Sequence, residues 1–228
     1  MRTAGIVAVS IAALVAAGCT SAGAENSAKN IVVYSGQLGP DWTQSETTPD
    51  FDGDKQPLTL AASTEAERCS RPAPSDGPTA TASGDWIENQ TSGGFVYNQV
   101  VYHQNAVDAD ALAADFADPA MFDGWRKLAL PAFAKSASTQ GQTLTDATVA
   151  LVPVAAPAGT KAVGIRFTGT LHQPDGRVVP IREDTTSLFV GRSEALVMVG
   201  GATDGFPEST EQLVAGMIAG RLLKADTA

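Results

Sequence analysis

Residues 163–200 read VGIRFTGTLHQPDGRVVPIREDTTSLFVGRSEALVMVG, and this stretch decides the fold. At its start, every second residue is apolar or a glycine: Val163, Ile165, Phe167, Gly169 and Leu171. The residues between them are smaller or polar. Strict alternation is the pattern of a half-buried β-strand that turns one apolar face toward a core. The stretch therefore predicts a strand over residues 163–171.

Two turns divide the rest of this stretch. His-Gln-Pro-Asp-Gly at residues 172–176 carries Pro-Asp-Gly turn chemistry, and Gly-Arg-Ser-Glu at 191–194 is a second turn. Residues 177–190 form the returning strand, and residues 195–200 are apolar on both faces, as in a central strand. The expected result is an antiparallel meander.

The flanking sequence predicts further strands and helices. Residues 95–102 and 148–154 are expected to form strands. A helix is expected from Asp108, a second from Pro119 that Pro131 breaks or ends, and a last one from about Pro207. The buried stripe expected of the last helix is Leu213, Val214, Met217, Ile218 and Leu222, and its small residues Gly216 and Gly220 are expected to let the backbone pack closely on the sheet.

The order of these segments predicts an α+β fold, an antiparallel sheet of about five strands with helices packed against it. The chain has 228 residues, 43% of them hydrophobic and 18% charged, which fits one folded domain. We place that domain at residues 85–228. Residues 19–84 are rich in small and polar side chains and are expected to form a largely flexible tether, in which 30–34 and 58–60 are apolar islands able to add an edge strand.

The N-terminus has the layout of a lipoprotein export signal. Arg2 precedes an apolar run that closes on Leu-Val-Ala-Ala-Gly-Cys at residues 14–19, so residues 1–18 are expected to be a signal peptide. The run is too short to span a bilayer permanently. By resemblance to bacterial lipoproteins, Cys19 would carry a diacylglycerol and an amide-linked acyl chain, which would hold the protein on the outer face of the cell membrane. The alternative is an ordinary secreted protein cleaved near residues 22–24.

Charge and cysteine content exclude other classes. The net charge of −10 disfavours nucleic acid and anionic headgroups as partners, so the expected membrane contact is the lipid at Cys19. With Cys19 lipidated, Cys69 has no intramolecular partner, and we interpret it as a small packed residue. The acidic run at residues 50–54 lacks EF-hand spacing and is interpreted as a solvated turn.

Several segments together resemble the LpqN and LpqT lipoproteins of mycobacteria, whose domain is PsbP-like. They are the Trp-containing start at residues 84–86, the strand from Gly93, the strand at 164–171 with its turn at 174–177, and the closing strand and helix from Ala195. The resemblance covers roughly residues 84–223. A second resemblance is to the extracellular sensor domains of actinobacterial Ser/Thr kinases, whose usual cysteine pairs are missing here.

The first resemblance implies a non-catalytic cell-envelope protein that binds a protein partner or an amphiphile. The alternatives are a lipid carrier with an apolar cavity or an extracellular sensor domain, and a hydrolase is the least favoured. His103 and His172 are the only histidines and do not form a metal-binding pair, so we expect no catalytic residues, no metal and no cofactor. The oligomeric state and the identity of the ligand are not predicted.

One pair of side chains is a candidate ligand site. If five residues close the turn, Phe167 faces Ile181, Arg166 faces Arg182, and Asp184 is diagonal to Arg166. Facing arginines would bind a carboxylate or phosphate of a ligand. The alternative is that Glu183, Asp184 or a helix carboxylate neutralises them as a solvated ladder.

Overall fold

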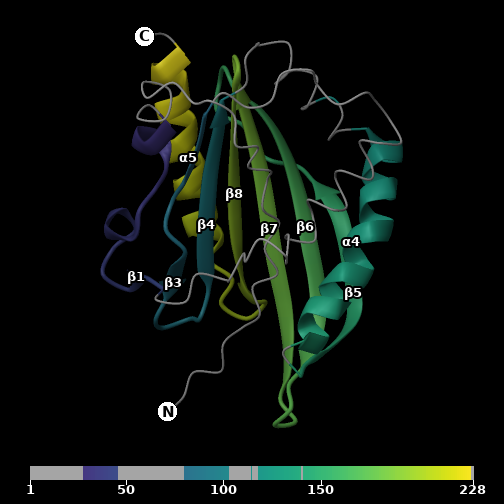
Figure 1. Ribbon diagram of the computed structural model, residues 1–228. Coiled ribbons are helices and arrows are strands. Elements are labelled where there is room, and N and C mark those ends of the chain that lie inside the picture. The colour runs from purple at the N-terminus through teal and green to yellow at the C-terminus, as the bar shows by residue number, and fades with distance from the viewer. Residues whose placement is uncertain (1–27, 46–79, 103–113, 115–117, 140, 227–228) are drawn as a thin grey trace.

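The computed structural model describes residues 28–45, 80–102, 114, 118–139 and 141–226 (Figure 1). The strands are β1 (Trp42–Gln44), β2 (Ala80–Ser83), β3 (Ile87–Asn89), β4 (Phe95–Tyr102), β5 (Thr143–Val152), β6 (Lys161–His172), β7 (Val178–Val190) and β8 (Ser193–Ala202). The helices are the short 3₁₀ helix η1 (Ser35–Gln37), α4 (Pro119–Thr139) and α5 (Glu208–Asp226). The predicted strands at 95–102, 163–171, 177–190 and 195–200 are all present, within about two residues at their ends.

The strands form one antiparallel sheet, so the predicted α+β class is confirmed. Its order is β1-β3-β4-β8-β7-β6-β5, and β2 also pairs with β4. In the described part of the chain the sheet has eight strands, so the prediction of about five was too low. The additional strands are β1, β2 and β3, each only three or four residues long, which is too short for a periodic pattern to show.

The hairpin between β6 and β7 closes one residue later than predicted. Gln173 N–H donates to the carbonyl of Arg177, and Gly176 lies within the turn at φ +85°. The closed loop therefore spans residues 173–177, and His172 pairs with Val178. This shift moves the register by two, so that Phe167 faces Glu183 and Arg166 faces Asp184, in place of the predicted partners.

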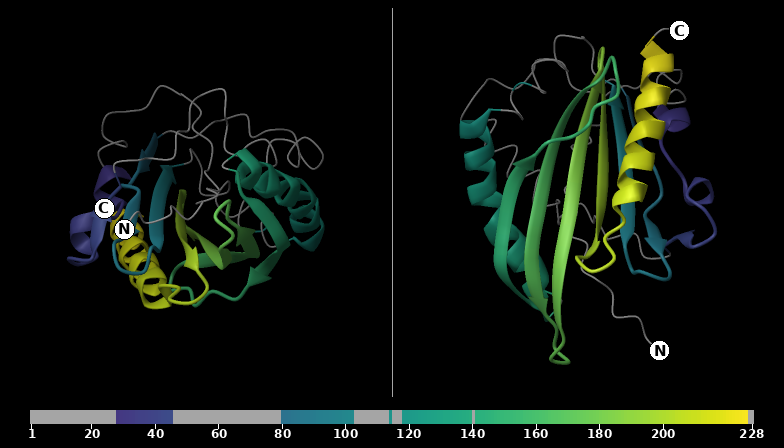
Figure 2. Two further views of the ribbon diagram at one scale, coloured as in Figure 1. Left: turned by 90° about the horizontal axis from the view of Figure 1, so that it is seen from below. Right: turned by 180° about the vertical axis from the view of Figure 1, so that it is seen from behind.

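The sheet is curved and has a helix on each side (Figure 2). We call the side against which α5 packs the α5 face and the opposite side, where α4 lies, the α4 face. The larger apolar cluster lies on the α5 face and joins α5 to β4, β7 and β8. The second cluster lies on the α4 face. Because both faces are covered, β4 and β8 are buried almost throughout.

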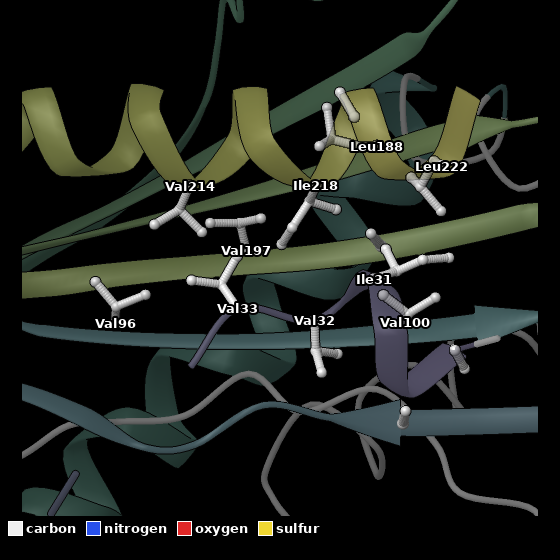
Figure 3. Close-up of a cluster of buried hydrophobic side chains, with 14 of the residues drawn as sticks. Ile31, Val32, Val33, Val96, Val100, Leu188, Val197, Val214, Ile218 and Leu222 are labelled. Atoms are coloured by element: carbon white, nitrogen blue, oxygen red, sulfur yellow. The ribbon is translucent and has the colours of Figure 1, made fainter. Parts of the chain in front are cut away.

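Helix α5 contacts the sheet through a narrower stripe than predicted. Val214, Ile218 and Leu222 are fully buried and point toward Val197 and Leu188, as Figure 3 shows. Leu213 is 49% exposed, because it lies one residue before Val214 and so projects about 100° around the helix from the buried stripe.

The prediction of close packing at the glycines of α5 was wrong. A Cβ added at Gly216 or at Gly220 would meet no atom within 4 Å. The tight glycines lie in the sheet: a Cβ at Gly200 would meet the ring of Phe95 at 2.3 Å.

Residues 28–34, which the sequence assigns to the tether, contribute four buried side chains to the core: Ala28, Ile31, Val32 and Val33. Ile31, Val32 and Val33 are buried beside α5 (Figure 3), and residues 28–31 form a helical turn, so the expected edge strand at 30–34 is absent. The side chain of Asn98 on β4 holds this segment: Val33 N–H donates to Asn98 Oδ1 at 2.8 Å, and Asn98 Nδ2 donates to the Val33 carbonyl at 2.9 Å. The described parts of the predicted tether therefore belong to the fold, since β1 and β2 also lie in the sheet.

Two further corrections concern helices. Pro131 lies inside α4 and does not end it, because the helix continues to bury Ala129, Phe133 and Ala137 against the sheet. Apart from residue 114, the helix predicted from Asp108 lies outside the described residues, as do Cys19, Cys69, the island at 58–60 and the acidic run at 50–54. None of the helices in the described ranges is long and apolar enough to cross a membrane.

Candidate functional site

The two arginines of the predicted ligand site both bind one carboxylate on the α5 face. Arg166 Nε and Nη2 donate to Asp184 Oδ1 and Oδ2, each at 2.7 Å. Arg182 donates to Oδ2 of the same Asp184 through Nε at 3.1 Å and also through Nη2. Asp184 is 2% exposed. The shared bidentate geometry is the strong form of an ion pair.

Helix α5 completes this network. Arg182 Nη1 donates to Glu208 Oε1 at 2.6 Å, and its guanidinium lies 4.0 Å from the centre of the Phe206 ring. Thr186 Oγ1 donates to Glu211 Oε1 at 3.2 Å. The network therefore joins the sheet to the start of α5, and it fits the alternative in which carboxylates neutralise the arginines.

The electrostatics agree with that structural role. Burial alone would raise the pKa of Asp184, but the hydrogen bonds and charges of Arg166 and Arg182 lower it below its ordinary value. Burial raises the pKa of Glu211, and the charge of Asp184 adds to that effect. Two guanidinium groups thus stand among three carboxyl groups, and no excess positive charge remains to attract an anion.

The α4 face has a different character, because aromatic side chains gather on it. Trp86 stacks on Phe95 with ring centres 4.6 Å apart, and Phe133 of α4 lies 4.4 Å from Phe167 of β6. The buried members of the cluster are Trp86, Phe95, Tyr97, Ala129, Phe133, Ala137, Val149, Ile165, Phe167, Leu171, Ile181, Leu196 and Met198. The side chains of this cluster are all buried, at 7% exposure or less, so they form an apolar core on this face.

Glu183, Thr185 and Gln99 are among the polar side chains buried on this same face. Glu183 is 5% exposed and lies opposite Phe167, Thr185 is 3% exposed and lies opposite Met198, and Gln99 is 3% exposed and lies opposite Leu196. Glu183 Oε1, Thr185 Oγ1 and Gln99 Oε1 have no hydrogen-bond partner among the residues that the structure describes. Burial, and then the charge of Asp184, raise the pKa of Glu183 well above its ordinary value.

The sequence suggested Glu183 as a counter-ion of the arginines, but the structure places it on the opposite face of β7, and no prediction singled out Thr185 or Gln99. The signal was present in residues 182–187, where polar residues occupy consecutive positions of a strand and so must lie on both faces.

The histidines do not add a site. His172 Nε2 lies 3.0 Å from Thr145 Oγ1 at the exposed end of β6, and His103 is outside the described residues. Within the described ranges, no group of three or more His, Cys, Asp or Glu side chains is arranged to hold a metal ion.

No family model and no curated protein matches the sequence. Among solved structures, the extracellular domain of PknH from Mycobacterium tuberculosis matches with a TM-score of 0.44 and 13% identity, over 88% of this chain and 96% of that chain. At this level of similarity the match assigns no ligand, partner or activity.

Proposed function

We propose that this chain is a non-catalytic lipoprotein of the cell envelope whose domain binds an amphiphilic ligand on the α4 face. The observation that carries the proposal is the aromatic cluster of that face together with the unbonded atoms of Glu183, Thr185 and Gln99. Ligand sites typically combine an apolar lining with a few polar groups that fix orientation. A buried polar atom without a partner costs free energy, so its retention needs a reason such as a bound molecule or an ordered water.

The proposed location rests on the N-terminal sequence. The run that ends at Cys19 has the features of a lipobox, so we propose that acyl chains on Cys19 hold the domain on the outer face of the membrane. Two or more acyl chains give stable anchoring, whereas one gives marginal binding. The α+β architecture is compatible with the proposed kinship to the PsbP-like LpqN and LpqT lipoproteins.

Native purification tests both halves of the proposal. The full chain is expressed in an actinobacterium, extracted in detergent and compared with Cys19→Ala, and its intact mass and bound lipids are measured by mass spectrometry. We expect the wild-type chain to carry the mass of a diacylglycerol and to enter the detergent phase, and Cys19→Ala to lack the modification. An unrelated lipoprotein purified in the same way is the control for adhering lipid.

The two halves can fail separately. A wild-type chain without acyl modification refutes the anchor. A chain that co-purifies with no more amphiphile than the unrelated lipoprotein refutes the ligand, and a protein crosslinked to residues of the α4 face would replace the amphiphile with a protein partner.

A further inference from the structure

The chain enters the fold only a few residues after the proposed lipid anchor. Nine peptide links separate Cys19 from Ala28, and even fully extended they span no more than ~30 Å. Ala28 is fully buried, and Arg221 of α5 donates to the carbonyls of Ile31 and Val32 at 2.9 and 2.6 Å. An anchor at Cys19 would therefore hold this part of the domain within ~30 Å of the bilayer surface.

Residues 28–31 lie at one end of the sheet, beside the C-terminal end of α5 (Figure 1). The turn between β7 and β8 reaches the same place, because a Cβ added at Gly191 would meet the carboxylate of Asp226. The loop before β6 does so too, since a Cβ at Gly159 would meet Leu223 at 3.1 Å. We call this end, made of residues 28–31, 159–161, 190–194 and 221–226, the anchor end. The hairpin between β6 and β7 lies at the other end of β7, whose 13 residues span ~40 Å.

The anchor end is basic, although the whole chain has a net charge of −10. Its basic side chains are Lys29, Lys161, Arg192, Arg221 and Lys224. All of them except the partly buried Arg221 are exposed. The acidic residues in the same ranges are Glu194 and Asp226, so these ranges together carry a net charge of +3.

The opposite end of the sheet is acidic. Thr203 N–H donates to the carbonyl of Pro180, which places the loop before α5 beside the hairpin. A Cβ at Gly94 would meet Pro207 at 3.2 Å, which places the turn before β4 there as well. Residues 88–94, 173–177 and 203–208 contain four acidic residues and one basic residue, a net charge of −3: Glu88, Asp175, Arg177, Asp204 and Glu208. The described domain is thus polarised along its sheet, and its positive end is the one nearest to Cys19.

A membrane surface with anionic head groups attracts Lys and Arg side chains that come within a screening length of it, ~10 Å at 0.1 M salt. The short link to Cys19 allows the anchor end to come that close. We propose that the anchor end docks on an anionic lipid surface, so that the C-terminal end of α5 points toward the bilayer and the β6–β7 hairpin projects away from it. This inference rests on the proposed lipid anchor and adds an orientation. The repulsion expected from the net charge then acts on the acidic end, which faces away from the lipid.

Energy transfer from the protein to the bilayer tests the orientation. The full chain with Cys69→Ser is expressed in an actinobacterium, its acylation is confirmed by intact mass, and it is reconstituted into phosphatidylcholine vesicles with or without phosphatidylglycerol. An acceptor dye is carried by lipid head groups. The donor dye is attached at Gly220→Cys, where a side chain meets open space, or at Val178→Cys beside the hairpin, where Val178 is 56% exposed.

On anionic vesicles, we expect transfer from Gly220→Cys to exceed transfer from Val178→Cys at least about twofold. The reason is the separation of the two positions along the sheet, ~30 Å, which is the rise of the helix from Glu208 to Gly220 plus that of the strand from Arg182 to Val178. On vesicles of phosphatidylcholine alone the ratio should be lower, because the link to Cys19 then acts without the charges.

Two pairs of substitutions with the same change in net charge separate docking from the effect of the link. Arg192→Glu with Lys224→Glu reverses two charges of the anchor end, and Lys127→Glu with Lys135→Glu reverses two exposed charges of α4. The first pair should lower the transfer ratio on anionic vesicles to its value on neutral ones, and the second should leave it unchanged. Salt at 1 M should act on the wild type as the first pair does, since the screening length falls to ~3 Å.

The outcomes distinguish this inference from the proposed function. Equal transfer from both positions of an acylated chain on anionic vesicles overturns the docking and leaves the anchor in place. A high ratio that persists on neutral vesicles, in 1 M salt and in the anchor-end variant overturns the attraction to anionic lipid and leaves the short link as the cause of the orientation. A wild-type chain without acyl groups overturns both the anchor and this inference.

Discussion

Replacing Asn98 by Ala should release the N-terminal segment from the sheet. The side chain of Asn98 is fully buried and makes two hydrogen bonds to Val33, at 2.8 and 2.9 Å. Truncation leaves the N–H and the carbonyl of Val33 without these partners inside the core. Each unsatisfied buried group costs ~1–3 kcal/mol, so the free energy of unfolding should fall by about 2–5 kcal/mol. That is a large part of the ~5–15 kcal/mol typical of a domain.

The assay is urea unfolding of the full chain, followed by far-UV circular dichroism. Gln90→Ala is the control, because Gln90 Nε2 also donates a hydrogen bond, to Thr43 Oγ1 at 2.7 Å, but on the exposed surface. We expect the control to lose less than about 0.5 kcal/mol. Asn98→Asp should be less stable at pH 7 than at pH 4, since it buries a charge. A loss below about 1 kcal/mol in Asn98→Ala, or equal losses in both alanine variants, would refute this account.

Three other predictions concern the sheet. An unfolded chain loses the Glu183 proton near the ordinary pKa of 4.5, whereas the native state keeps it to higher pH, so this group lowers stability as pH rises above 4.5. Glu183→Gln should therefore gain stability over the wild type with rising pH, by at most ~1.4 kcal/mol per pH unit, and parallel urea profiles at pH 4, 5.5 and 7 would contradict this. Asp184→Ala leaves two arginines without their shared acceptor and should lower the free energy of unfolding by about 2–3 kcal/mol in the same assay. This is less than for a fully buried pair, because the side chain of Arg166 is 36% exposed. A loss below about 0.5 kcal/mol, the range of a surface pair, would count against the network. Gly200→Ala drives a Cβ into the Phe95 ring and should lower the melting temperature, whereas Gly216→Ala, which meets open space in a helix, should raise it; the reverse order would contradict the packing.

The sequence predicted the long strands because their patterns repeat over many residues. Alternation from Val163 to Leu171 and the apolar run from Ala195 identify β6 and β8 without any knowledge of their partners. The segment at residues 28–34 was missed as part of the core because its partner is a side chain, Asn98, and no local pattern encodes a contact 65 residues away. Strand periodicity also says nothing about β1, with three residues.

The candidate site was predicted in part, and the error has a definite cause. Arg166, Arg182 and Asp184 do lie on one face, because a register shift of two preserves the face of every side chain. It changes the partner, however, and so converts two facing arginines into an arginine that faces a carboxylate. The unbonded groups at Glu183 and Thr185 were not predictable, since burial depends on what covers the opposite face.

The way residues 28–34 join the fold has a mechanical consequence. Arg221 of α5 donates from Nη1 to the carbonyls of Ile31 at 2.9 Å and Val32 at 2.6 Å, next to the bonds that Asn98 of β4 makes. A pulling force on the N-terminal side of this segment would therefore load a helix and an inner strand together, and would not peel an edge strand away one bond at a time. If acyl chains hold the N-terminus in a membrane, extraction of the lipid should compete with rupture of several bonds in parallel.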